Sequence, residues 1–153
     1  MTIPVEFLVH GRPSSVNATS AKKKVWKTAV NAAAASALGS SPPPPHAGEV
    51  TVKFFFFPTS RQYTDVDNGI KHTLDAISPP VLQNDKTVMR VVAERFVPEP
   101  GSSLIVPVGI APILANALMS ASGQSAFLAG AGKPQYATAI KVVPYTEKSG
   151  EHW

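Results

Sequence analysis

Four carboxylates and two lysines lie within residues 64–88, which read TDVDNGIKHTLDAISPPVLQNDKTV. Asp65 and Asp67 are two positions apart, so in an extended segment they point to the same side. A helix that follows would place Lys71 and Asp75 one turn apart on one face, and a further loop brings Asp85. Several carboxylates with a lysine are suited to hold a hard divalent cation such as Mg²⁺, whose remaining ligands are water and phosphate oxygens. The pattern therefore favours metal-assisted chemistry on phosphates.

Each of these residues also has an interpretation without catalysis. Asp67, or Asn68 beside it, can cap the helix. Lys71 and Asp75 can form an ordinary surface ion pair between positions i and i+4. Asp85 can belong to a turn with the asparagine before it. The residue types alone leave both interpretations open.

The elements that position this stretch can be predicted from hydrophobic periodicity and from turn residues. The sequence predicts a helix that Ser20 caps, that runs to about Leu38 and stops at Gly39, and that turns an apolar side including Val25 and Trp26 towards the core. The run EVTVKFFFF predicts a central strand. The full set of predicted elements is strands at 3–10, 49–57, 87–96 and 104–110, and helices at 20–38 and 67–77.

The fold class that follows from this order, β-α-β-α-β-β, is α+β, with a small mixed β-sheet and helices packed on it. Beyond residue 110 the pattern is weaker and predicts a helix of small residues at 113–128, a strand at 138–143 and a loose tail at 147–153. We therefore expect one domain over residues 1–110. Residues 111–153 are expected to be a C-terminal extension packed on that domain or at a dimer interface.

Composition limits the possible functions. The 153-residue chain has no cysteine, which excludes disulfides, thiolate metal sites and cysteine nucleophiles. Its net charge of +4 is compatible with nucleic acid as a partner. All of that net charge falls in residues 1–95, whereas residues 102–132 contain no charged side chain. The first part is expected to be the working surface, and the neutral segment to be packed in the core or at a subunit interface.

Targeting segments are not apparent in the sequence. The start, MTIPVEFLVHG, lacks the basic residues and the cleavage site of a secretory signal. The neutral stretch 104–118 is too short to span a bilayer and contains two prolines. These observations predict a cytoplasmic protein with no membrane partner.

The motif Asp65-Val-Asp67-Asn68-x-x-Lys71-x-x-x-Asp75-Ala-Ile, followed by Asn84-Asp85-x-x-Val88, resembles the signature of RusA-type Holliday junction resolvases. The turn GRPSSVN at residues 11–17 is similar to the turn after the first strand in that family. The resemblance covers about residues 3–110. It implies a small, homodimeric, magnesium-dependent endonuclease that cuts four-way DNA junctions symmetrically in recombination and repair, of a kind often encoded by prophages.

The resemblance also assigns roles to individual residues. Asp65, Asp67 and Asp85 match the metal-binding catalytic aspartates of the family, and Lys71 matches its catalytic lysine. Asn68 and Asp75 match supporting positions. The implied cofactor is Mg²⁺, with Mn²⁺ as the alternative.

A site with three acidic side chains needs basic residues around it to bind DNA, because carboxylates repel the phosphate backbone. The candidates for contacts with branched DNA are Arg61, Lys86, Arg90, Lys22, Lys23 and Lys24. The lysines at the start of the first helix can equally be a solvated helix end.

Two other functions remain open at this stage. One is a RusA-like module that holds branched DNA without cutting it. The other is an interaction protein whose hydrophobic C-terminal third is the functional surface. Metal-dependent cleavage separates the nuclease from the first, and a tight complex with another protein together with weak DNA binding would favour the second.

Overall fold

The computed structural model describes residues 2–15, 17–58, 67, 69–96 and 136–146 of the chain. In these ranges the elements, in chain order, are β1 (Val5–His10), α1 (Ser20–Leu38), β2 (Val50–Phe57), α2 (Ile70–Ala76), the 3-10 helix η1 (Asp85–Thr87), β3 (Val88–Arg95) and β4 (Ala137–Pro144). The predicted strand 104–110, the predicted helix 113–128 and the tail 147–153 lie outside the described residues.

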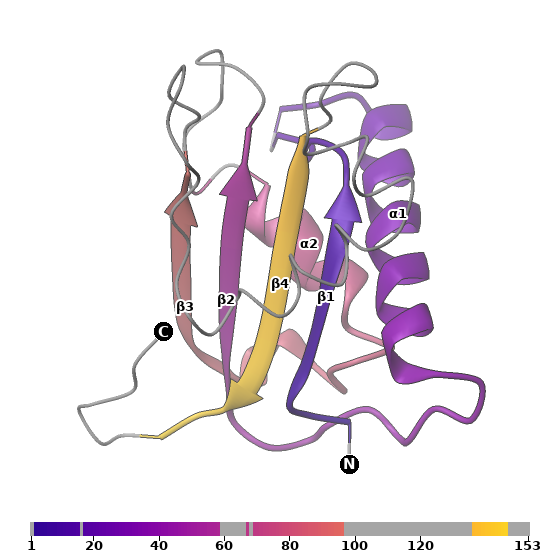
Figure 1. The fold of residues 1–153 in the computed structure, drawn as a ribbon, viewed down its shortest axis with the longest axis vertical. Coiled ribbons are helices and arrows are strands. Elements are labelled where there is room, and N and C mark those ends of the chain that lie inside the picture. Colours follow the sequence, from indigo (N-terminus) through magenta and orange to yellow (C-terminus); the bar gives the residue numbers. More distant parts are fainter. Residues whose placement is uncertain (1, 16, 59–66, 68, 97–135, 147–153) are drawn as a thin grey trace, which may run out of the picture.

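The four strands form one mixed sheet in the order β1-β4-β2-β3. β4 is antiparallel to both β1 and β2, whereas β3 is parallel to β2. Figure 1 shows β4, in yellow, lying between β1 and β2, although these two strands are nearer to each other in the sequence. The predicted fold class, α+β with a small mixed sheet and helices packed on it, is confirmed.

The central strand is β2, and all eight of its residues are buried. Side chains on a strand alternate between the two faces of the sheet. Phe54 and Phe56 accordingly join the core cluster that includes residues of both helices, whereas Phe55 and Phe57 join a second cluster with Ala139. Because one cluster contains residues of α1 and α2 together, both helices pack on the same face of the sheet.

Helix α1 contacts this face through Trp26, Val30 and Ala34, which are buried. Val25 was expected on the apolar side, but it is 71% exposed. That expectation was wrong because Trp26, Val30 and Ala34 already form the buried stripe at intervals of four residues, and the position before Trp26 turns away from it.

The ends of α1 match the sequence pattern closely. Thr19, one residue before the predicted Ser20, is the N-cap, and its side chain accepts a hydrogen bond from the Lys22 N–H at 3.3 Å. Gly39 ends the helix with a φ of 87°, in the region where glycine is favoured.

The strand predicted at 138–143 is confirmed as β4. Part of the expected extension 111–153 is therefore an internal strand of the sheet. The boundary expected at residue 110 lies outside the described residues and stays a prediction. Neither helix in the described part of the chain is both long and apolar enough to cross a membrane.

Candidate active site

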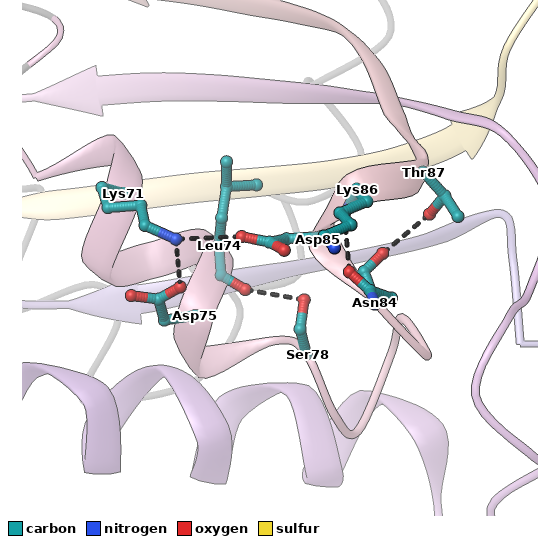
Figure 2. A network of polar contacts seen from close by, with 8 residues as sticks. All are labelled: Lys71, Leu74, Asp75, Ser78, Asn84, Asp85, Lys86 and Thr87. Atoms are coloured by element: carbon teal, nitrogen blue, oxygen red, sulfur yellow. Dashed lines mark hydrogen bonds and ion pairs between the residues drawn. The ribbon is translucent and has the colours of Figure 1, made fainter.

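Lys71 lies in the first turn of α2 and forms two ion pairs. Its Nζ lies 2.7 Å from Oδ1 of Asp75, one turn further along the helix, and 2.9 Å from Oδ2 of Asp85, at the start of η1. Figure 2 shows the ammonium between the two carboxylates. The Lys71 side chain is 63% exposed, and those of Asp75 and Asp85 are 33% and 32% exposed. The cluster is thus open to a ligand from solvent.

The turn before β3 positions Asp85. Asn84 is the N-cap of η1, and its side-chain oxygen accepts a hydrogen bond from the Lys86 N–H at 2.9 Å. The Asn84 carbonyl accepts a second bond from the Thr87 hydroxyl at 2.8 Å (Figure 2). The turn that was the structural alternative for Asp85 is therefore present. It presents the carboxylate to Lys71, so the two interpretations of this residue are compatible.

The start of α2 differs from the sequence prediction. The helix begins at Ile70 rather than at residue 67 and ends at Ala76, and its N-cap is Gly69, without a side-chain cap hydrogen bond. Asp67 contributes only its backbone carbonyl, which accepts from the Ile70 N–H at 3.3 Å. Of the two candidate caps, Asp67 therefore does not cap the helix, and Asn68 lies outside the described residues. The exposed side chain of Asp67 is not used by the helix and is compatible with a role as a ligand.

The two carboxylates change the electrostatics of Lys71. The hydrogen bonds that Lys71 donates, first to Asp75 and then to Asp85, raise the pKa of Lys71 to about 12. In return, the hydrogen bond from Lys71 lowers the pKa of Asp85 below its ordinary value. At neutral pH Lys71 is therefore a cation beside the ionised carboxylate of Asp85. In this arrangement it can supply positive charge or orient a water molecule, but it has no lone pair with which to accept a proton.

The loop between β1 and α1 packs against the start of α2. A Cβ atom added to Gly69 would lie 2.7 Å from Cβ of Pro13 and 2.9 Å from the carbonyl oxygen of Ser14. The φ of Gly69 is 96°, which side-chain-bearing residues rarely adopt. Because Gly69 has no side chain, the loop can pack against it. Gly69 is two positions from Asp67 and two positions from Lys71 in the sequence.

A buried pair of hydrogen bonds connects α1 to the same point. The indole Nε1 of Trp26 donates to the Thr73 hydroxyl at 2.9 Å, and that hydroxyl donates to the Gly69 carbonyl at 2.8 Å. Sequence analysis did not identify Thr73, because 47 positions separate it from Trp26 and no spacing links them. The only available signal was that a buried indole N–H requires an acceptor.

The predicted DNA-binding residues occupy three places. Lys22, Lys23 and Lys24 lie in the first turns of α1. Lys86 is exposed on η1, next to Asp85. Arg90, on β3, lies at the end of β4, with its guanidinium 5.1 Å from the centre of the Tyr145 ring and 3.5 Å from the Thr146 carbonyl.

The metal site was predicted from Asp65, Asp67 and Asp85. Asp65 lies outside the described residues, as do Arg61 and Asn68. In the part of the chain that the structure describes, no group of three or more His, Cys, Asp or Glu residues could hold a metal ion. Asp67 is exposed and Oδ1 of Asp85 is not used in the pair with Lys71, so both can offer the hard oxygen ligands that Mg²⁺ requires. The residues fit the predicted ion, and the complete ligand set stays a prediction.

The sequence matches the family model described as Endodeoxyribonuclease RusA over residues 8–106, more than half of the chain. The chain belongs to the RusA endodeoxyribonuclease family. The resemblance inferred from the aspartate motif is therefore confirmed. A comparison with curated proteins found no match.

The RusA match begins in β1, ends after β3 and contains Asp67, Lys71, Asp75 and Asp85. The Lys71 cluster thus lies within the region that the chain shares with RusA endodeoxyribonucleases. β4 falls outside this region, yet it lies between two of the matched strands. The RusA fold of this chain is consequently completed by residues beyond the matched segment.

Proposed function

We propose that this protein is a metal-dependent, structure-specific endonuclease that resolves four-way (Holliday) junctions by hydrolysing phosphodiester bonds. The observation that carries the proposal is the Lys71 cluster: in a chain of an endodeoxyribonuclease family, an exposed lysine is held by two carboxylates from separate segments. An ion pair needed only for stability would require one carboxylate and would contribute little at such exposure.

The metal would be held by Asp65, Asp67 and Asp85, with Mg²⁺ as the ion and Mn²⁺ as the alternative. When bound, it would lower the pKa of a water molecule and polarise the phosphoryl oxygen. Lys71, protonated at neutral pH, would face the phosphate and stabilise the negative charge that develops in the transition state. Asp75, at 2.7 Å, would keep the ammonium group in place when Asp85 is engaged by the metal.

Contacts with the DNA backbone would come from the basic residues. Lys86 is next to Asp85 on η1, and Lys22, Lys23 and Lys24 begin α1, whose preceding loop packs on Gly69. Arg61 and Arg90 would extend this surface. Such contacts supply most of the affinity for DNA and weaken with increasing salt.

A homodimer would suit this substrate. Each subunit would contribute one Lys71 cluster, and a two-fold axis would place two clusters on two strands of a junction, whose symmetry is also two-fold. Analytical sedimentation at low concentration tests this part of the proposal, and a monomer in the presence of the junction would contradict it.

The decisive experiment incubates the purified protein with a synthetic four-way junction and with a linear duplex of the same sequence, each with and without Mg²⁺. We expect paired cuts near the branch point of the junction only when Mg²⁺ is present, with the duplex left intact. Tight binding without any cleavage would instead indicate a non-catalytic branched-DNA module. Weak binding to both DNAs would favour a function in protein interaction.

A further inference from the structure

A cavity of about 780 Å³ lies between the β1–α1 loop and the first turns of α1. Its walls include Ser14 on the loop side and Ala21, Val25 and Trp26 on the helix side. Its size falls in the range of about 300–1,000 Å³ that is common for pockets that bind small organic groups. The cavity is distinct from the Lys71 cluster, which involves none of its lining residues.

The lining of the cavity combines apolar and positively charged side chains. Val25 provides apolar surface and is one of three large hydrophobic side chains that are exposed among the described residues, whereas Trp26, which also lines the cavity, is only 4% exposed. Arg12 and Lys22 provide positive charge, and none of the described lining residues is acidic. A ligand that combines a flat apolar group with a negative charge complements such a surface.

Ser14 provides a second, independent indication of a ligand. Its side-chain oxygen is buried and has no hydrogen-bond partner, and the residue is only 8% exposed. A buried hydroxyl without a partner is destabilising for the protein by itself. Because Ser14 lines the cavity, a change of its χ1 rotamer could turn the hydroxyl towards a polar group of a bound molecule.

The cavity is also connected to the Lys71 helix. The carbonyl of Ser14 would be 2.9 Å from a Cβ atom on Gly69, so the loop is in close contact with the residue that precedes α2. On the other side, Trp26 donates its indole hydrogen bond to Thr73 of α2. A group seated in the cavity would therefore lie on elements that directly contact the helix carrying Lys71.

We propose that this cavity receives one base of the bound DNA, unstacked from its neighbours at the branch point, with the adjacent phosphate on Arg12 and Lys22. A base has an apolar face for the exposed Val25 and a polar edge for the Ser14 hydroxyl. At a branch point base pairs lack one stacking neighbour, which lowers the cost of moving a base out. The inference rests on the proposed action on branched DNA and adds to it a base-binding site.

The test measures binding of the full chain to labelled four-way junctions by fluorescence anisotropy in EDTA, so that no cleavage occurs. One set of junctions carries a single abasic site at each nucleotide flanking the branch point. For the wild type we expect one position at which loss of the base weakens binding about tenfold. Ala21→Trp, which fills the cavity from an exposed helix position, should bind the intact junction about tenfold more weakly and show no further loss with that abasic site.

Ala35→Trp is the matched control, because Ala35 is exposed on the same helix and does not line the cavity. It should retain the wild-type response to the abasic site. Ser14→Ala should weaken binding of the intact junction while leaving the melting temperature of the free protein unchanged or higher, since it removes an unpaired buried hydroxyl. A purely structural role for Ser14 would not produce these opposite effects.

An abasic penalty of the same size in Ala21→Trp and in the wild type would overturn the inference, as would failure of the wild type to bind any junction. A change in sedimentation of Ala21→Trp without a change in DNA binding would also overturn it, and would assign the cavity to a second copy of the chain. Cleavage in Mg²⁺ is scored separately. If binding depends on the base but the junction is not cut, this inference stands and the proposed function is wrong. If the junction is cut but binding does not depend on the base, the proposed function stands and this inference is wrong.

Discussion

At the scale of single residues, the arrangement of Lys71 explains why a helix-surface ion pair and a catalytic group are hard to distinguish by sequence. The i,i+4 pair with Asp75 is of a kind that is common on exposed helix surfaces. Asp85, from a turn 14 positions away, is not explained by helix periodicity. Because Asp85 is itself expected to bind the metal, this second pair holds the ammonium beside the predicted metal site.

Replacing Lys71 by alanine should separate catalysis from stability. Its ion pairs are exposed, so their loss should change the free energy of unfolding by less than about 1 kcal/mol. Loss of a cation aimed at the transition state should lower the single-turnover cleavage rate on pre-bound junction by about 10²–10³-fold. Lys86→Ala is the control, because it should weaken DNA binding and leave that rate near the wild-type value. An unchanged rate for Lys71→Ala would refute the catalytic role.

Asp67→Asn tests a residue for which the structure excludes the alternative role of N-cap of α2. Because the Asp67 side chain does not cap α2, the substitution should leave the melting temperature unchanged. Cleavage should be abolished if the carboxylate binds metal, and junction binding should be equal or tighter because one negative charge near the phosphates is lost. Gel-based cleavage and anisotropy measure the two effects. Cleavage at a near wild-type rate in Mg²⁺ would show that Asp67 is not a ligand.

At the scale of elements, the start of α2 depends on Gly69. Its φ of 96° and the nearby Pro13 and Ser14 leave no room for a side chain. Any residue placed here would move the loop, the helix or both. The relative position of the cavity and of the Lys71 cluster is therefore determined largely at this glycine.

Gly69→Ala should destabilise the protein by about 2 kcal/mol or more, since it adds a close contact to the cost of about 1–2 kcal/mol for a left-handed conformation. Gly39→Ala is the matched control. Gly39 also has a positive φ, 87°, but a Cβ there would meet nothing within 4 Å. Urea denaturation of both variants gives the difference. Equal destabilisation by the two substitutions would show that the contact of the loop with Gly69 is easily relieved.

The local elements were predictable because their signals are local. The helix at 20–38 has the predicted bounds, and Gly39 ends it, because cap residues and periodicity act within a few residues. The cap at Gly69 was not predictable, since it depends on packing against Pro13, a residue in another loop. The Trp26–Thr73 hydrogen bond was missed for the same reason. In the site, the motif was enough to predict which residues take part. That Lys71 pairs with Asp75 and Asp85 at the same time could be seen only in the folded structure.

At the scale of the whole molecule, the position of β4 changes how the chain is divided. Periodicity predicted the strand, but strand pairing is a long-range property and its place in the sheet could not be inferred. β4 pairs with β1 over six residues, Val5–His10, and with β2 over eight, Val50–Phe57. Without it, β1 would have no partner among the described strands, and β2 would have a free edge on that side.

A fragment that ends at residue 110 should therefore fail to fold, although it contains the whole family match and the Lys71 cluster. Removal of β4 would leave the backbone groups of two strands unpaired. It would also take Ile140 and Val142 out of the main core cluster and expose the apolar side chains that pack with them. Circular dichroism and an amide NMR spectrum of the fragment should show an unfolded chain. Addition of a peptide spanning residues 136–146 should restore structure if pairing with β4 is the missing contribution. A fragment that melts cooperatively and cuts junctions by itself would contradict this account, because β1 and β2 would then have to form a stable sheet without the strand that lies between them.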